Sequence, residues 1–308
     1  MRIVVIGQAA FGAKVLEALL DNGENVVAAY APPDKPGGRP DPLADAATSK
    51  GIRVVQPKTY KDDQVFADYK ALDPDLTVMA FVTDIIPPRY FDVPSKGTIN
   101  YHPSLLPRHR GGSAINWAVI MGDTRTGLSI FWPDGGIDTG PILLQKQIEI
   151  HPDDTTGSLY FNHLFPMGVD AILESIALIK EGTAPKIPQS DVEATYEPLC
   201  DDKVAQIDWS RPSVEVYNLV RGCDPQPGAY TYFSSEKIRF YSTKLIHEAT
   251  DKAPGAILHI DDQGIHAAVA GGRLLIGRAK TEKGKKVAGP ELAAELGMKA
   301  GDRFTVQS

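Results

Sequence analysis

The sequence predicts an α/β fold: a mostly parallel, Rossmann-like sheet followed by a small β-barrel-like domain of the OB type. In the first half of the chain, short apolar runs alternate with amphipathic stretches. This alternation is typical of parallel strands covered by helices on both faces. A proline-rich stretch then leads into a second half in which short runs of alternating polarity follow one another closely. Closely spaced short strands indicate a small antiparallel barrel or sandwich.

The first half begins with an apolar run at residues 3–6, which predicts a buried strand, and continues with a helix over residues 10–20. A second strand is expected at residues 25–30. Proline and glycine are frequent in residues 31–42, so this segment is expected to form a surface loop. Further strands are predicted at residues 53–55, 76–81 and 98–101, separated by the stretches 43–50 and 63–72.

A longer helical pattern runs over residues 155–180 and stops at Glu181-Gly182, a typical helix end. Prolines then recur as in an interdomain linker. We therefore predict an N-terminal domain at residues 1–183, a linker at 184–203 and a C-terminal domain at 204–308. In the C-terminal domain a helix is expected at 213–222, with strands at 229–233, 237–246, 256–260, 265–269 and 273–279.

The composition is that of a globular protein, with 43% hydrophobic and 23% charged residues. A net charge of −7 argues against general nucleic-acid binding, which depends on an excess of lysine and arginine. Cys200 and Cys223 are too few for a disulfide framework and are expected to be reduced thiols. No apolar run has the length of a signal-peptide core or a membrane span. These observations predict a cytoplasmic protein.

Three polar side chains mark the end of the strand predicted at residues 98–101. They are Asn100, His102 and, further along the chain, Asp138 in the segment Gly136-Ile137-Asp138-Thr139-Gly140. Positions two apart on a strand share a face, so Asn100 and His102 are expected to lie roughly 7 Å apart on one side. Ligands of open α/β sheets bind at the carboxyl ends of the strands, and this favours a functional site there.

These side chains supply an amide, an imidazole and a carboxylate, the groups needed to move an acyl-type carbon between nitrogens. Attack of an amine on a formyl carbon builds negative charge on oxygen, which the Asn100 amide or a protonated His102 could stabilise. His102 could also relay protons, and a nearby Asp138 would fix its tautomer. Each residue alone is typical of a turn, but their combination at a sheet edge indicates a site.

Two other kinds of site are less well supported. Gly7-Gln8-Ala9-Ala10-Phe11-Gly12 follows a strand and opens a helix, but Ala9 replaces the middle glycine of a dinucleotide-binding turn. No acidic residue follows the next strand to hold a ribose, and no phosphate-binding loop with a Gly-Lys-Ser/Thr ending occurs. The spacing of a zinc site is also missing from His102, His109, His151 and His163.

At these residues the chain resembles the 10-formyltetrahydrofolate-dependent formyltransferases, which include methionyl-tRNA, glycinamide ribonucleotide and sugar-nucleotide formyltransferases. The resemblance covers nearly the whole chain and is strongest to the N-terminal hydrolase domain of 10-formyltetrahydrofolate dehydrogenase. It rests on the stretches YHPSLLPRHRG at 101–111, SAINW at 113–117, SIFW at 129–132, GIDTG at 136–140 and ATYE at 194–197.

This resemblance implies the formyltransferase fold, with residues 1–183 as its catalytic domain. It implies 10-formyltetrahydrofolate as formyl donor, without a metal or NAD(P), and Asn100, His102 and Asp138 as the catalytic set. Three segments are expected to hold the folate, largely through backbone groups: Phe81, Val82, Thr83, Asp84 and Ile85; Ser104, Leu105, Leu106 and Pro107; and Asp134, Gly135, Gly136, Ile137 and Gly140.

The formyl acceptor stays open at this point. In the hydrolase domain of the dehydrogenase the position matching Asn100 is apolar, whereas formyltransferases carry asparagine there, so Asn100 favours transfer to an amine. The segment Pro33-Asp34-Lys35-Pro36 is similar to the tRNA-side loop of methionyl-tRNA formyltransferase, but it runs into the hydrolase-like Asp41-Pro42-Leu43. We expect an amine acceptor, methionyl-tRNA or a smaller molecule, although the net charge does not favour tRNA.

Two alternatives accompany this expectation. The first is a hydrolase that releases formate and tetrahydrofolate. The second is a non-catalytic folate- or RNA-binding protein. The stretch from Arg273 to Lys286 is rich in basic residues and is typical of a solvated hairpin face, or else of a surface that contacts a phosphate backbone.

Overall fold

The computed structural model describes residues 1–306 and divides the chain into two compact units. The first comprises Met1–Gly112, Gly127–Ile148 and Asn162–Tyr196, and the second comprises the segments between them together with the chain from Glu197 onward. The domain boundaries predicted at residues 183 and 204 stay predictions. The last two residues of the predicted C-terminal domain, 307 and 308, lie outside the described residues.

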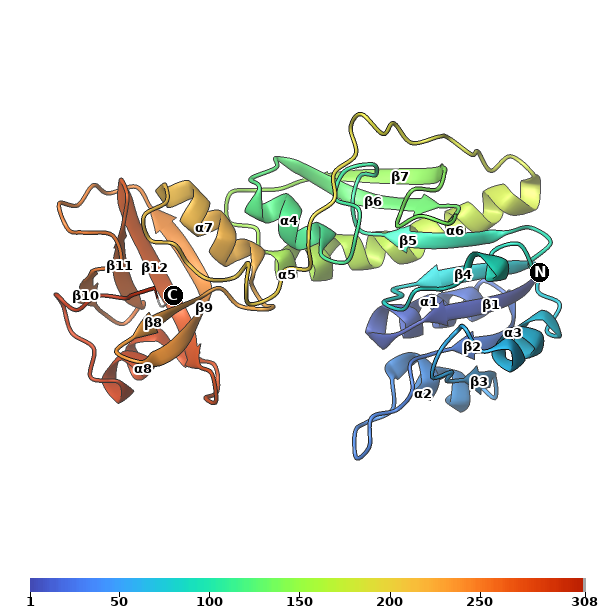
Figure 1. Ribbon diagram of the computed structural model, residues 1–308, viewed down its shortest axis with the longest axis horizontal. Coiled ribbons are helices and arrows are strands. Elements are labelled where there is room, and N and C mark those ends of the chain that lie inside the picture. The colour runs from blue at the N-terminus through green and yellow to red at the C-terminus, as the bar shows by residue number, and fades with distance from the viewer. Residues whose placement is uncertain (307–308) are drawn as a thin grey trace. The chain divides into compact units, whose positions relative to one another are not determined.

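A seven-stranded sheet forms the centre of the first unit, in the order β3-β2-β1-β4-β5-β6-β7 (Figure 1). Strands β1 to β5 pair in parallel, and β6 runs antiparallel to β5. The predicted mostly parallel α/β sheet is therefore confirmed. The strands are β1 (Arg2–Gly7), β2 (Asn25–Tyr30), β3 (Arg53–Val55), β4 (Leu76–Ala80), β5 (Thr98–His102), β6 (Arg125–Phe131) and β7 (Ile142–Glu149).

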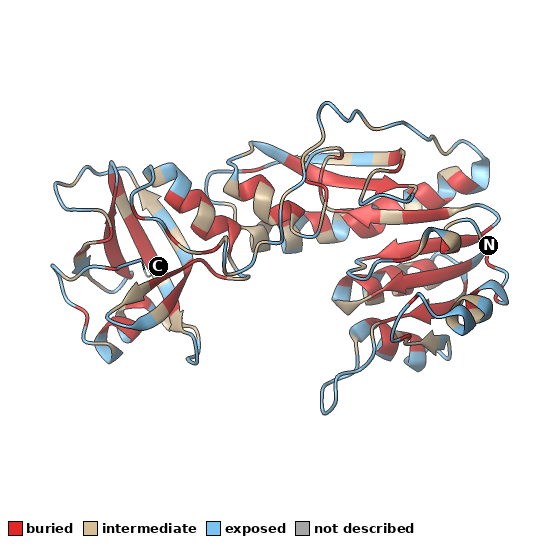
Figure 2. Ribbon diagram, in the orientation of Figure 1, coloured by how far each residue is buried: buried red, intermediate tan, exposed pale blue. Residues whose placement is uncertain are grey.

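Helices cover both faces of this sheet, and the inner strands β1, β4 and β6 are buried almost throughout (Figure 2). One face packs against α1 (Ala9–Asp21), α2 (Pro42–Ser49) and α6 (Phe165–Glu181). On the other face, buried tyrosines gather around α3 (Asp63–Lys70) and the short helix η1 (Pro88–Tyr90). Strand residues therefore alternate between two separate apolar layers, the pattern expected of a parallel sheet buried on both sides.

The helix predicted at residues 155–180 forms as three consecutive pieces. It begins as α5 (Thr156–Leu159), passes through the π-helical segment η2 (Tyr160–Leu164) and continues as α6. Thr155 and Ser158 form a reciprocal capping box at its start. Gly182 closes α6 with a positive φ of 73°, a conformation that glycine adopts without strain, so the predicted helix stop is confirmed.

The second unit contains the small β domain that the sequence predicted. Its curled antiparallel sheet has the order β10-β11-β12-β9-β8, and β13 pairs with β12. Helix α4 (Ala114–Ile120) belongs to this unit and packs on α7 (Ser213–Gly222), where Asn116 Nδ2 donates to the Gly222 carbonyl at 2.8 Å. The other elements are β8 (Tyr230–Phe233), β9 (Glu236–Ile246), β10 (Ile257–Ile260), β11 (Ile265–Val269), β12 (Gly272–Thr281), β13 (Val287–Ala288) and α8 (Gly289–Glu295).

Within residues 1–306, no helix combines the length and the apolar character that crossing a membrane requires.

An ion-pair cluster on the second unit predicts a pH-dependent contribution to stability. A hydrogen bond from Arg239 is the main reason that the pKa of Asp202 is lowered from 3.8 to about 2. Lys237 acts in the same direction, and burial opposes the shift with a smaller effect. A depressed carboxyl pKa stabilises the fold above the unfolded value, and the contribution is lost as pH falls from about 4 to about 2. Asp202→Asn is therefore expected to lower the Tm at pH 7.

The measurement is a series of thermal melts of both proteins from pH 7 downward. The difference in Tm is expected to shrink between about pH 4 and pH 2, because both proteins then carry a neutral side chain at position 202. A difference that stays constant over this range would contradict the assignment. Asp202 is half exposed, so the effect is expected to be modest.

Candidate active site

Strand β5 places Asn100 and His102 on the same face of the sheet. Ile99 and Tyr101 point into the layer formed with α1 and α6, so the residues between and after them face the other side. His102 is the last residue of β5 and only 5% exposed. Both polar side chains therefore lie toward the carboxyl end of a central parallel strand, where open α/β sheets bind ligands.

The imidazole of His102 has defined partners on both ring nitrogens. Nε2 lies 2.8 Å from the backbone carbonyl of His109, which can only accept, so Nε2 carries a hydrogen and donates it. Nδ1 lies 3.5 Å from Oδ2 of Asp138. Asp138 therefore orients the ring from the Nδ1 side, and the His109 carbonyl orients it from the Nε2 side.

Asp138 is held by its backbone and by its side chain. Its φ of 54° lies in the left-handed region that few non-glycine residues adopt, a conformation typical of tight functional turns. Oδ2 accepts the backbone N–H of Gly111 at 2.8 Å. Earlier in the same loop, Asp134 Oδ1 accepts the N–H of Gly136 at 3.0 Å and the hydroxyl of Thr139. The loop thus presents one carboxylate to His102 in a fixed position.

Asn100 carries a buried polar atom whose partner is not part of the protein. Its Oδ1 makes no hydrogen bond to any residue that the structure describes. Buried polar groups are nearly always hydrogen-bonded, so an orphaned amide beside an imidazole and a carboxylate indicates a place for a ligand or an ordered water. Because an amide oxygen only accepts, the group that fits here is a donor, such as a water molecule or an amine N–H.

The three segments predicted to hold the folate differ in their exposure to solvent. The segment after β4 is exposed, including Ile85 at 82%, and Phe81 starts it with a φ of 61°. Ile137 in the Asp138 loop is 62% exposed. Because β4 and β5 are parallel neighbours, the segment after β4 begins at the same sheet edge as His102. Exposed apolar side chains beside a polar cluster are typical of a surface that covers a planar ligand.

The Ser104–Leu106 turn, in contrast, is closed off by hydrogen bonds within the protein. Ser104 is fully buried and donates to the Arg108 carbonyl at 2.6 Å. The Leu106 N–H donates to Ser129 Oγ at 3.1 Å, and the Leu106 carbonyl accepts from Gln145 at 2.8 Å. These groups support the loop beside His102, and their folate contact stays a prediction.

Matches to known families decide what kind of protein carries this site. A model of the formyl transferase family matches residues 1–168, and a model of the family's C-terminal domain matches residues 201–297. The chain belongs to the formyl transferase family. The family that the sequence predicted is thereby confirmed.

Two curated relatives are similar in sequence to this family member over most of its length. It is 43% identical over 251 residues to the cytosolic 10-formyltetrahydrofolate dehydrogenase of Xenopus tropicalis, a match covering 80% of this chain and 28% of that protein. It is 34% identical over 294 residues to the methionyl-tRNA formyltransferase of Ruminiclostridium cellulolyticum, which covers 93% of this chain and 94% of the relative. The chain thus spans less than a third of the dehydrogenases and nearly all of the tRNA enzyme.

Solved structures show the same fold at low sequence identity. HypX from Aquifex aeolicus matches with a TM-score of 0.72 at 19% identity, covering 100% of this chain and 53% of HypX. The N-formyltransferase of Helicobacter canadensis matches with a TM-score of 0.68 at 18% identity, covering 90% of this chain and 98% of that enzyme. These structures support the two-part architecture of this formyl transferase family member.

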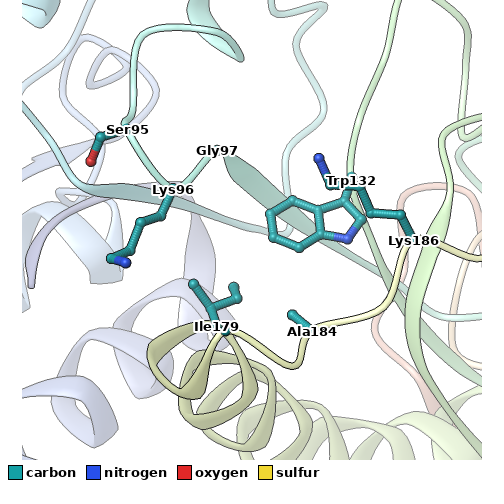
Figure 3. Close-up of a pocket in the computed structure, with 8 residues that line it drawn as sticks. Ser95, Lys96, Gly97, Trp132, Ile179, Ala184 and Lys186 are labelled. Atoms are coloured by element: carbon teal, nitrogen blue, oxygen red, sulfur yellow. The ribbon is translucent and has the colours of Figure 1, made fainter.

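A cavity of about 320 Å³ in this family member has Trp132, Ala184 and Lys186 in its wall (Figure 3). It is next to Gly97, which precedes β5, whereas His102 ends that strand. Its wall includes the ring of Trp132, with Lys186 Nζ 4.9 Å from the ring centroid. None of the predicted catalytic or folate-binding residues is among those that line it. The polar cluster is therefore a candidate site because of the chemistry of its side chains, and this cavity is not part of it.

The turn after β1, considered above for dinucleotide binding, carries a carboxylate where a phosphate would bind. Asp41 accepts the N–H of Ala9 at 2.9 Å and that of Leu43 at 2.9 Å, and so lies at the N-termini of α1 and α2. A pyrophosphate at the start of α1 would be repelled by this charge. In this family member Asp41 therefore caps the start of α1 and of α2.

One side-chain cluster in the second unit has the composition of a metal site. His259, Asp261 and His266 place potential ligand atoms within 4.8 Å of one another. However, Arg273 Nη1 lies 2.7 Å from His266 Nδ1, which must accept from it, so Nε2 carries the hydrogen and faces Asp261 at 3.1 Å. Burial and the neighbouring His259 and Arg273 lower the pKa of His266, against the effect of Asp261. The hydrogen bonds of His266 to Arg273 and Asp261 therefore account for the close approach of these side chains.

Proposed function

We propose that this protein transfers the formyl group of 10-formyltetrahydrofolate to an amine. The observation that carries the proposal is the assembly of Asn100, His102 and Asp138 at one sheet edge, with the Asn100 amide oxygen unpartnered. Among known proteins, HypX has been solved with tetrahydrofolic acid, and the Helicobacter canadensis enzyme with folinic acid and dTDP-3-aminofucose. Folate ligands on this fold support a folate donor here.

In the proposed reaction, the acceptor nitrogen forms a bond to the formyl carbon, and the bond from that carbon to N10 of the folate then breaks. The proton lost by the amine is transferred to N10, so atoms and charge balance. Negative charge develops on the formyl oxygen in between. The Asn100 amide N–H is one donor to it. Nε2–H of His102 is committed to the His109 carbonyl and Nδ1 faces Asp138, so the ring is held in a fixed place beside the reacting groups.

Asp138 has two proposed roles in this scheme. Its carboxylate lies 3.5 Å from Nδ1 and orients the imidazole ring. It also relays the proton between the amine and N10, through a water molecule. The Gly111 N–H on Oδ2 keeps the carboxylate aimed while this happens.

The second candidate is hydrolysis of 10-formyltetrahydrofolate to formate and tetrahydrofolate, with water in place of the amine. It is favoured by the 43% identity to a dehydrogenase that acts on this folate. Asn100 favours the transferase, since the resemblance assigns an apolar residue to this position in the hydrolase domain. We also propose a cytoplasmic location, because Cys200 and Cys223 are free thiols.

The test supplies 10-formyltetrahydrofolate labelled in the formyl carbon together with methionyl-tRNA, a panel of amines and amino sugars, or buffer alone. Label in an amine product supports the proposal and identifies the acceptor class. Label released as formate at the same rate with and without amines would establish the hydrolase. Binding of the folate without any loss of the label would leave a non-catalytic binding protein and overturn both.

A further inference from the structure

We propose that Gln189 and Thr195 are positioning residues of the active site. Both lie in a segment that we call the strap, residues 183–196, most of which the sequence predicted to be a linker. The structure assigns this strap to the first unit. Gln189 holds the loop that carries Asp138, and Thr195 holds the loop that carries His109. These loops supply the two groups between which the His102 ring lies.

Gln189 joins the strap to the backbone on both sides of Thr139. Its Nε2 donates to the carbonyl of Asp138 at 2.8 Å and to that of Gly140 at 2.7 Å. A Cβ at Gly140 would lie 1.8 Å from the Trp132 carbonyl oxygen, so the loop has no room to rearrange on that side. Because Asp138 has a positive φ, its backbone needs outside support, and Gln189 provides it.

Arg110 fixes Gln189 in turn. Its Nη2 donates to Gln189 Oε1 at 2.8 Å and its Nη1 to the hydroxyl of Tyr196 at 2.7 Å, and the residue is only 3% exposed. The next residue, Gly111, donates its N–H to the Asp138 carboxylate. The Arg110-Gly111 dipeptide therefore holds Asp138 twice: directly through its carboxylate, and through Gln189 by its backbone.

Thr195 acts on the opposite side of the imidazole. Its Oγ1 accepts the N–H of His109 at 2.8 Å, and its carbonyl accepts the N–H of Arg110 at 3.1 Å. The Thr195 N–H donates to the carbonyl of Pro107 at 3.3 Å. His109 has a φ of 55°, and its carbonyl is the acceptor for His102 Nε2–H. Thr195 thus sets the orientation of the group that fixes the imidazole tautomer.

The start of the strap is anchored independently of these contacts. Trp132 Nε1 donates to the Pro185 carbonyl at 2.9 Å, and Figure 3 shows Lys186 beside the Trp132 ring. Ile187 and Ile142 exchange two backbone hydrogen bonds of 2.8 and 2.9 Å. The strap is therefore held at both ends and contacts both loops between them.

The experiment compares Gln189→Met and Thr195→Val, which keep side-chain size and remove the hydrogen bonds, with Ser190→Ala as a control in the same strap. Displacing a catalytic group by about 1 Å can cost about 100-fold in rate. We expect kcat for formyl release to fall roughly 10- to 100-fold in both variants, with the KM for 10-formyltetrahydrofolate unchanged. Thr195→Ser restores the hydroxyl and is expected to recover most of the rate.

The second readout is hydrogen–deuterium exchange, which does not depend on the proposed function. Amide exchange is expected to accelerate at residues 134–140 in Gln189→Met and at residues 107–111 in Thr195→Val, and to stay unchanged in Ser190→Ala. Unchanged exchange in both loops would overturn the inference. If the unsubstituted protein releases no formyl group, the proposed function fails, and the exchange data still decide whether the strap positions the loops.

Should Thr195→Val fail to fold, Gln189→Met together with Thr195→Ser decides the matter. Slow turnover in the first and near-normal turnover in the second supports the positioning role. Normal kcat in Gln189→Met, with its loop as protected as before, overturns it.

Discussion

Replacing Asn100 with alanine is expected to lower kcat for formyl release by roughly 100- to 1000-fold, the loss that follows removal of one oxyanion donor. In transition-state free energy this is about 2.7–4 kcal/mol. The reason is that the amide lies on the same face of β5 as His102, where its N–H is proposed to donate to the formyl oxygen.

The measurement is single-turnover release of labelled formyl carbon, together with folate affinity from quenching of tryptophan fluorescence. Affinity is expected to change little, because the donor acts on charge that develops only in the transition state. Asn100→Asp keeps the shape, loses the N–H and should be as slow. Asn25→Ala, at an exposed position that begins β2, is the matched control. Turnover near the unsubstituted rate in Asn100→Ala would remove this residue from the proposed chemistry.

For Asp138→Asn we expect a loss of at least roughly 100-fold; the same change in an established imidazole–carboxylate pair costs about 10⁴-fold. The amide oxygen can still accept the Gly111 N–H, so the loop is expected to keep its shape. What is lost is the negative charge 3.5 Å from His102 Nδ1. The variant separates the charge of Asp138 from its structural role.

The check is again single-turnover chemistry at saturating folate, with Asp170→Asn on the exposed side of α6 as control. Folate binding is expected to persist, because the substitution is isosteric. A fully active Asp138→Asn would refute the proton-relay and ring-orienting roles. A variant that no longer binds folate would instead assign Asp138 to binding.

Much of the first unit could be predicted from periodicity. Strands β1, β2 and β4 are nearly continuous apolar runs, which is what burial on both faces requires. Strand β6 was missed because Arg125, Thr126 and Gly127 open it without an apolar run, although neighbouring elements bury most of it. Helix α4, with the sequence AINWAVI, was missed because it is apolar nearly all round and shows no amphipathic period.

The candidate site likewise has one part that could be predicted from the sequence and one part that could not. A period of two places Asn100 and His102 on one face, so their proximity could be predicted from sequence. The groups that hold Asp138 could not. Gln189 lies 51 positions from Asp138, and Gly111 lies 27 positions away, each in an irregular segment. Periodicity says nothing about where two loops meet, and such contacts appear only in three dimensions.

The chain passes between its two units several times, and this limits where it can be cut. The second unit takes in residues 113–126 and 149–161 as well as the chain after residue 196. A C-terminal fragment beginning near residue 200 would lack α4 and expose the side of α7 where Gly222 packs closely on Ile120. The second unit is therefore not contained in one continuous stretch of the chain. A single cut at residue 196 would leave α4 in one product and α7 in the other, joined by contacts such as that of Asn116 with Gly222.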